Sequence, residues 1–266
     1  MVQPMTSNKL KPGDTTAITL TVEKLQLLSY LSFWIIVMTG IFLTERFSDI
    51  DLENTTFQEV IGYNNICIYF DTPPSTYVLP FFWAITLVIF LIYLVANWLQ
   101  MIRQLKAGHL DQNLYQLLSR LKLFEAFTLV FFSTVFAVSP EGWDHTLFIH
   151  TIPFLMVQIG VTSMAISGTL FGIKSGYWER LELAKWFKWA NILDCILISL
   201  VVVLYIPMLI NAMADGIWWA HTDRLSSLAE VLDRCFLFLS AIVPLLNAIY
   251  LVCFKSDKIE VVNIAL

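Results

Sequence analysis

Long runs of apolar residues alternate with short polar links along almost the whole chain. Each run is long enough to cross the hydrocarbon core of a bilayer as a helix, which takes about 20 residues. Charged residues gather in the links between the runs. The pattern therefore predicts six membrane-spanning helices, at Leu25–Thr44, Val78–Ile102, Leu121–Val138, Leu147–Ile173, Trp189–Met213 and Leu225–Phe254.

The six runs leave no room for a separate globular domain. We expect an all-α fold, a polytopic six-helix transmembrane domain over residues 25–254, with an N-terminal segment 1–24 and a tail 255–266. Only the link 45–77 is long, and its aromatic residues favour packing against the bundle, as a short strand pair or as a cap. The run Leu25–Thr44 is too long for a signal peptide, so we expect it to remain as the first helix.

The composition agrees with a membrane protein, because 58% of the 266 residues are hydrophobic and only 14% are charged. Four cysteines are too few and too scattered for a disulfide scaffold or a zinc site. The sequence has no Gly-rich phosphate loop and no HExxH, GxSxG or CxxC motif, and nothing in it indicates nucleic-acid binding. We therefore predict no cofactor and no metal. Whether the protein is an enzyme stays open.

Lysine and arginine are distributed unevenly between the links. Thirteen belong to the N-terminus, to residues 103–122, to residues 174–188 or to the C-terminus, and three belong to the other links. By the positive-inside rule, both termini are predicted to be cytosolic. Asn54 begins an Asn-Thr-Thr glycosylation acceptor, which is used only on the opposite face of the membrane. The long first link would then be lumenal or extracellular.

Ionisable residues inside the apolar runs are informative, because each costs about 2.5–3.5 kcal/mol near the bilayer centre. At the predicted outer end, His150 lies at the mouth of the fourth helix, and Glu230 lies near the start of the sixth. Both are candidate catalytic residues: His150 as an acid, base or hydrogen-bonding group, and Glu230 as its partner or as a ligand-binding carboxylate. Arg234 has the spacing to pair with Glu230 and would hold an anionic group such as a lipid phosphate.

Further polar residues belong to the same end. Asp144 and His145 are expected at a similar depth, and Asp233 lies on nearly the same helix face as Glu230. With Arg234, they are candidate ligand-binding residues. The alternative is structural: an ion pair and a capped histidine that fix the sixth helix against the fourth.

At the predicted inner end, Glu125 and Asp194 lie one or two turns inside the third and fifth helices. Lys122 and Lys188 are close enough to pair with them or to extend towards water. We interpret both acids as structural charges within the membrane.

Prolines and glycines interrupt several of the runs. Pro80, Pro153 and Pro207 fall in the outer halves of helices two, four and five, where each frees a backbone carbonyl. They predict kinks or helix starts, or else a cavity at the outer side. Gly168 and Gly172 form a GxxxG motif, which permits close helix contact.

The order of these features resembles a known group: six helices with cytosolic ends, a long first outer link, a histidine at the mouth of helix four and an acid at that of helix six. The chain resembles the FRAG/DRAM/SFK superfamily of six-pass membrane proteins. Glu125 is closer to its post-GPI-attachment lipid-remodelling branch than to its autophagy branch. The segments that carry the resemblance are Leu123–Ala126, Asp144–Phe154, Ser226–Glu230 and Pro74–Val78.

The resemblance implies lipid handling, such as GPI-anchor lipid remodelling in the secretory pathway. His150, Glu230 and Arg234 would bound the site, membrane lipids would be the partners, and the Golgi, endoplasmic reticulum, lysosome or plasma membrane the location. Two alternatives stay open. One is a non-enzymatic regulatory or assembly subunit that binds other membrane proteins, and the other is an autophagy or lysosomal membrane modulator. For a small channel or transporter, the helices offer too few pore-lining charges.

Overall fold

Every regular element that the structure describes is helical, as predicted. The structure is a computed structural model. It describes residues 21–51, 54–55, 58, 63–137, 144–215, 223–257 and 259, and of residues 144–149, 209–215 and 223–226 it describes the backbone only.

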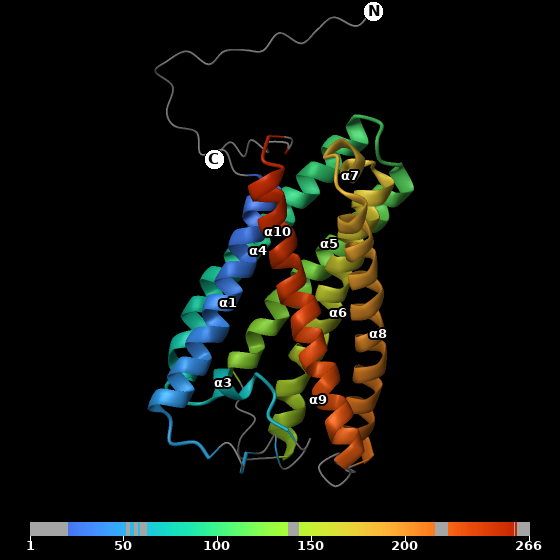
Figure 1. The fold of residues 1–266 in the computed structure, drawn as a ribbon. Coiled ribbons are helices and arrows are strands. Elements are labelled where there is room, and N and C mark those ends of the chain that lie inside the picture. Colours follow the sequence, from blue (N-terminus) through green and yellow to red (C-terminus); the bar gives the residue numbers. More distant parts are fainter. Residues whose placement is uncertain are drawn as a thin grey trace, which may run out of the picture.

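Six long helical rods lie side by side within the described residues (Figure 1). Two of them change helix type along their length, because η1 continues α5 directly and η3 joins α9 to α10. Short helices lie at the two ends of the bundle, α3 (Ile68–Asp71) at one and α7 (Tyr177–Arg180) at the other. The rods are α1 (Val22–Phe47), α4 (Ser75–Lys106), α5 (Gln112–Phe132) with η1 (Ser133–Ala137), α6 (Asp144–Lys174), α8 (Lys185–Asp215), and α9 (Asp223–Leu237) with η3 (Phe238–Ile242) and α10 (Val243–Phe254).

Among the residues that the structure describes, five helices are long and apolar enough to cross a membrane, which fits an integral membrane protein. They cover Val22–Phe47, Ser75–Lys106, His150–Lys174, Lys185–Met208 and Ser227–Phe254. The rod formed by α5 and η1 is not among them, because its first half carries Arg120, Lys122 and Glu125. The predicted rods are therefore present, while the count of six membrane crossings and the cytosolic placement of the termini stay predictions.

The rods pack in a closed ring. Along the chain, α1 packs on α4, α4 on α5, α5 on α6, α6 on α8 and α8 on α9, and α10 returns to pack on α1. The last rod thus contacts both the fifth rod and the first. The fifth rod packs against both α6 and α9, and residues of all three helices contribute to one apolar cluster with the first link.

The two ends of the bundle differ in charge. We call the end with α7 the basic end (top of Figure 1), because the starts of α1, α5 and α8 and the ends of α4, α6 and α10 bring most described basic residues there. We call the end with α3 the acidic end. The basic residues are Lys24, Arg103, Lys106, Arg120, Lys122, Lys174, Arg180, Lys185, Lys188 and Lys255; the acidic end has Glu45, Asp49, Asp71, Glu230 and Asp233.

The start of α5 lies outside the apolar run Leu121–Val138. Asp111 caps the helix, since its carboxylate accepts hydrogen bonds from the backbone amides of Asn113 at 2.9 Å and Leu114 at 3.1 Å. An aspartate at this position satisfies amide groups that have no partner inside the helix. The third rod therefore extends about two turns towards the basic end before its apolar part begins.

The described part of the first link caps the acidic end, and it is helical there. Cys67 and Ile68 are buried in the same apolar cluster as the inner faces of α8 and α9. The Tyr63 hydroxyl lies 2.9 Å from that of Tyr205 on α8, and the two hydroxyls are hydrogen-bonded. Burial raises the pKa of the Cys67 thiol well above its usual range, so this cysteine is an inert packing residue.

Glycines set how closely α6 approaches its neighbours. A Cβ at Gly160 would lie 1.9 Å from the Thr128 hydroxyl oxygen, so this glycine brings α6 against α5. The predicted GxxxG contact is only half right. A Cβ at Gly172 would overlap the ring of Trp178, whereas a Cβ at Gly168 would have nothing within 4 Å.

Candidate functional site

At the acidic end, His150 is paired with the first link. Its side chain is 1% exposed, and Nε2 lies 3.1 Å from Oδ2 of Asp71, the last residue of α3, which is 5% exposed. The structure thus gives His150 a different partner from the predicted Glu230. The reason is topological, because the first link reaches both rods at this end and supplies Asp71 to His150 and Asn65 to Asp233.

The three charged residues of α9 divide between two faces. Glu230 and Arg234 form the predicted ion pair four residues apart, with side chains 35% and 76% exposed. Asp233 is buried and accepts a hydrogen bond from the side chain of Asn65 in the first link. Asp233 therefore helps to hold the link, while the ion pair faces outward. Whether any of the three binds a ligand stays a prediction.

Other predicted residues of this end lie partly beyond what the structure describes. The backbone of Asp144 and His145 belongs to the first turn of α6, but their side chains lie outside the described residues. Asn54 is exposed, and its side-chain amide donates to the carboxylate of Asp51.

A hollow of about 560 Å³ adjoins Asp71 and is lined by the ends of α1 and α3 and the start of α4. The prolines inside the rods, Pro80, Pro153 and Pro207, do not line it.

Towards the basic end, Glu125 forms the structural network that its position predicts. Its side chain is fully buried, and Oε2 lies 2.8 Å from Lys122 Nζ. The hydroxyls of Ser163 and Ser167 on α6 donate to Oε1 at 3.2 and 2.8 Å. Lys122 also donates to Ser167 at 2.9 Å. Both charges are compensated, and the network ties α5 to α6.

Asp194 does not pair with Lys188, and Lys188 instead extends towards the surface, which is the second of the two predicted arrangements. Lys188 Nζ lies 2.7 Å from Glu179 Oε1 near the surface, and this hydrogen bond lowers the pKa of the Glu179 carboxyl. Lys188 lies at the start of α8, whereas Asp194 lies nearly two turns further along. Asp194 faces a cavity in the bundle instead.

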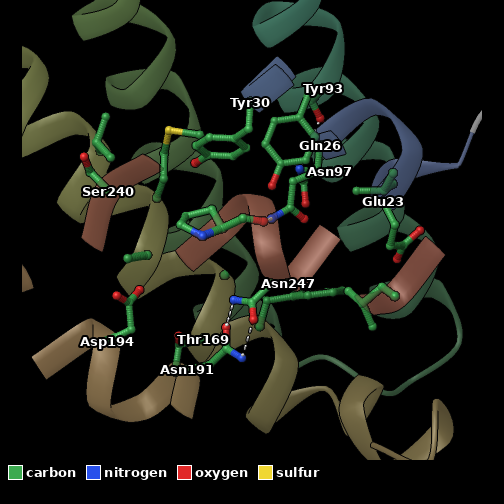
Figure 2. Close-up of a pocket in the computed structure, with 18 of the residues that line it drawn as sticks. Glu23, Gln26, Tyr30, Tyr93, Asn97, Thr169, Asn191, Asp194, Ser240 and Asn247 are labelled. Carbon is green, nitrogen blue, oxygen red and sulfur yellow. Dashed lines mark hydrogen bonds between the residues drawn. The ribbon is translucent and has the colours of Figure 1, made fainter. Parts of the chain in front are cut away.

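This central cavity has a volume of about 140 Å³ and lies among α1, α4, α6, α8 and the rod formed by η3 and α10, in the half of the bundle next to the basic end (Figure 2). Its lining is unusually polar for the interior of a membrane bundle, where ionisable groups are rare. It contains two carboxylates, Glu23 and Asp194, and five side-chain amides, from Gln26, Asn97, Gln100, Asn191 and Asn247. The lining contributed by the described residues includes no lysine or arginine.

Several hydrogen bonds position the lining. Asn191 on α8 and Asn247 on α10 donate to each other's side-chain oxygens, at 3.5 and 2.7 Å (Figure 2). Tyr177, next to the cavity at the basic end, donates to Glu23 Oε1 at 2.6 Å. These contacts hold the cavity walls together across elements that are far apart in the sequence.

The sixth rod is irregular where it borders the cavity. Pro244 has no N–H to donate to the carbonyl of Ser240, and the preceding segment Phe238–Ile242 widens into a π-helix. Side chains of α1 donate to two backbone carbonyls of this rod: Gln26 to Pro244 O at 3.1 Å and Trp34 to Ala241 O at 3.5 Å. Such π-segments occur frequently at functional sites.

Two buried polar atoms in the lining have no hydrogen-bond partner among the described residues. One is Oδ1 of Asp194, a residue that is 8% exposed, and the other is Nε2 of Gln100, a residue that is 2% exposed. Buried polar groups in folded proteins are nearly always paired with protein or with a bound molecule. The central cavity therefore offers one strong acceptor and one donor to whatever occupies it.

Most of these lining residues were not among the predicted site residues, because that prediction rests on charges at the helix mouths. A signal was present, since polar residues three or four apart lie on one face of a helix. Three helices carry such stripes, in apolar runs, and each stripe faces the cavity: Glu23, Gln26 and Tyr30 on α1, Tyr93, Asn97 and Gln100 on α4, and Asn191 and Asp194 on α8.

No protein-family model, no curated protein and no solved structure matches this chain.

Proposed function

We propose that this protein handles a membrane lipid and binds the polar headgroup of that lipid in the central cavity. The observation that carries the proposal is a cavity lined by two carboxylates and five amides within helices that are otherwise apolar enough to span a membrane. Polar groups at such depth are costly, and in membrane proteins they typically mark paths or binding sites for polar ligands.

The size of the cavity supports a small polar group as the occupant. One water molecule needs roughly 10–15 Å³ of such volume, so about 140 Å³ has room for a group of several non-hydrogen atoms. An acyl chain would find a poor match in a lining that is rich in amides. The exposed apolar side chains on the outer faces of the rods are the natural contacts for the chains of a lipid.

Gly168 offers a direct test, because it lines the cavity and a Cβ added there would meet nothing within 4 Å. Gly168→Leu should fill the cavity without displacing a neighbouring helix. We expect the wild-type protein, purified whole in dodecylmaltoside, to retain a lipid that native mass spectrometry detects. Gly168→Leu should lose most of it, and Gly168→Ala should lose little.

The matched control adds the same bulk outside the cavity. Ala190 is exposed on the outer face of α8, next to Asn191 in the sequence, and Ala190→Leu should leave lipid retention unchanged. Equal retention by Gly168→Leu and the wild type would reject the cavity as the headgroup site. Purification of a stoichiometric protein partner, with no bound lipid, would favour the assembly-subunit alternative.

A finer proposal, GPI-anchor lipid remodelling in the secretory pathway, is supported by the sequence resemblance alone. It predicts altered GPI-anchor lipid composition in cells that carry His150→Ala or Gly168→Leu at normal protein level. Normal anchor lipids in both variants would reject this task and leave the broader proposal standing.

A further inference from the structure

We infer that the headgroup recognised in the central cavity is a protonated amine, with Asp194 as its counter-ion. This inference rests on the proposed function and adds the chemical class of the ligand. Three features of the cavity carry it: the charge of its lining, the unpaired buried atoms, and the aromatic rings among the lining residues.

The charge of the lining favours a cation. Its ionisable groups include the carboxylates of Glu23 and Asp194, and its described residues contribute no lysine or arginine. A phosphate or carboxylate ligand would therefore face negative charge with no basic side chain to offset it. A cation gains from the same field, because charges of one sign in a low-dielectric cleft concentrate counter-ions.

The position of Asp194 makes it the natural counter-ion. The residue is 8% exposed, and within the described chain its Oδ1 has no hydrogen-bond partner. Glu23, by contrast, already accepts a hydrogen bond from Tyr177. In Figure 2, Asp194 and Glu23 lie at opposite sides of the group of lining residues. A buried carboxylate without a partner is costly, and an ammonium group that donates to it removes that cost.

The aromatic rings favour an organic ammonium over a metal ion. Tyr30, Tyr93, Trp178 and Phe187 contribute to the lining, and aromatic faces attract organic cations. Metal ions prefer clusters of several strong ligands, and the described residues contain no group of three or more His, Cys, Asp or Glu side chains that could hold one. A cavity of about 140 Å³ is also larger than a bare ion requires.

Because the described lining has no basic residue, the chemical class of the ligand can be narrowed further. A zwitterionic headgroup would bring a phosphate next to its amine, whereas a long-chain base has an amine and hydroxyls alone. The amides of Asn97, Gln100 and Asn247 suit hydroxyl groups, since an amide both donates and accepts hydrogen bonds. We therefore place a single-chain amphiphilic amine, of the sphingoid-base type, in the cavity.

The experiment compares two ligands that differ at the amine, because N-acetylation removes its charge and adds an acetyl group. Purified full-length protein in dodecylmaltoside, which contains no amine, is titrated with sphingosine or with N-acetylsphingosine, and binding is followed by the shift in unfolding temperature. We expect saturable binding of sphingosine and roughly 10- to 100-fold weaker binding of the uncharged amide, the range expected for one hydrogen bond to a charged group.

Asp194→Asn keeps the shape of the side chain and removes its charge. It should weaken sphingosine binding to the level of N-acetylsphingosine and leave binding of N-acetylsphingosine unchanged. Asp257→Asn removes an exposed carboxylate at the same end of the bundle and should change neither. If Asp194→Asn does not elute as a folded monodisperse species, the comparison of the two ligands on wild type and Gly168→Leu decides.

The outcomes separate this inference from the proposed function. Equal binding of both ligands, lost in Gly168→Leu, would overturn the amine and keep the lipid. Free ethanolamine competing as well as sphingosine would support the amine and overturn the lipid. Stabilisation by sodium chloride that depends on Asp194, without any by sphingosine, would assign the site to an inorganic cation and overturn the inference. Binding of neither ligand, with no lipid retained after purification, would overturn both.

Discussion

The two ends of the bundle use polar residues in opposite ways. At the acidic end, polar side chains pair with one another across elements: His150 with Asp71, Asp233 with Asn65, and Tyr63 with Tyr205. Towards the basic end, the central cavity leaves Asp194 Oδ1 and Gln100 Nε2 without partners among the described residues. Charge alone therefore does not identify the functional end of this protein.

The difference follows from what each polar group can reach. The first link folds back over the acidic end and supplies partners such as Asp71 and Asn65 to the rods beneath it. The cavity lining consists mainly of side chains from five rods that face one another across open space. The link with α7 supplies Tyr177 as a partner for Glu23, but among the described residues Asp194 Oδ1 receives none. A structural polar group is one whose partner is provided by the fold. A binding group is one whose partner has to arrive, and Asp194 fits the second description.

The largest expected effect tests whether the Glu125 network belongs to the structural class. Lys122→Met should lower the free energy of unfolding by about 3–5 kcal/mol, because it leaves the fully buried Glu125 without its cation. Thermal or denaturant unfolding in detergent measures this loss. The double variant Lys122→Met/Glu125→Leu should recover most of it, since an apolar pair avoids the uncompensated charge. A single variant as stable as wild type would show that Glu125 does not depend on Lys122.

The next effect concerns the partner of His150. Asp71→Asn should cost about 2–3 kcal/mol, the upper part of the range for a buried polar group that loses its partner, because both side chains are almost fully buried. A double-mutant cycle between His150→Ala and Asp71→Asn should show strong coupling. The matched cycle between His150→Ala and Glu230→Gln should show none. Coupling only in the second cycle would restore the pairing predicted from the sequence.

The rods could be predicted from the sequence, because apolar length and basic links follow directly from what a bilayer tolerates. Local pairs could be predicted too: Glu230 with Arg234 and Lys122 with Glu125 lie within one helical turn of each other. Contacts set by tertiary packing could not. The pairing of His150 with Asp71 depends on where the first link folds back, and the cavity depends on how five rods face one another.

The glycines of α6 give a smaller effect and test the packing between the ends. Gly160→Ala should cost about 1–3 kcal/mol, the usual penalty for overpacking, because the new Cβ would lie 1.9 Å from Thr128 Oγ1 and 2.7 Å from its Cβ. Gly168→Ala, two turns further along the same helix, should be neutral or slightly stabilising, since it enters open space and improves helix propensity. Unfolding temperatures of the two variants compare a packed glycine with a cavity glycine. Equal destabilisation would contradict open space at Gly168.

The smallest expected effect sharpens the comparison at the acidic end. Arg234→Ala removes an exposed ion pair on one helix, which is worth about 0.3–0.5 kcal/mol, because the arginine side chain is 76% exposed. The free energy of unfolding in detergent should therefore change little, and the amount of lipid retained after purification should not change. Asp233→Asn, one residue away and buried, is the control and should destabilise more, because it weakens the contact with Asn65. If Arg234→Ala instead removed bound lipid while Asp233→Asn did not, the outward face of α9 would be a lipid site. The acidic end would then also bind a ligand, which would contradict the contrast between the two ends.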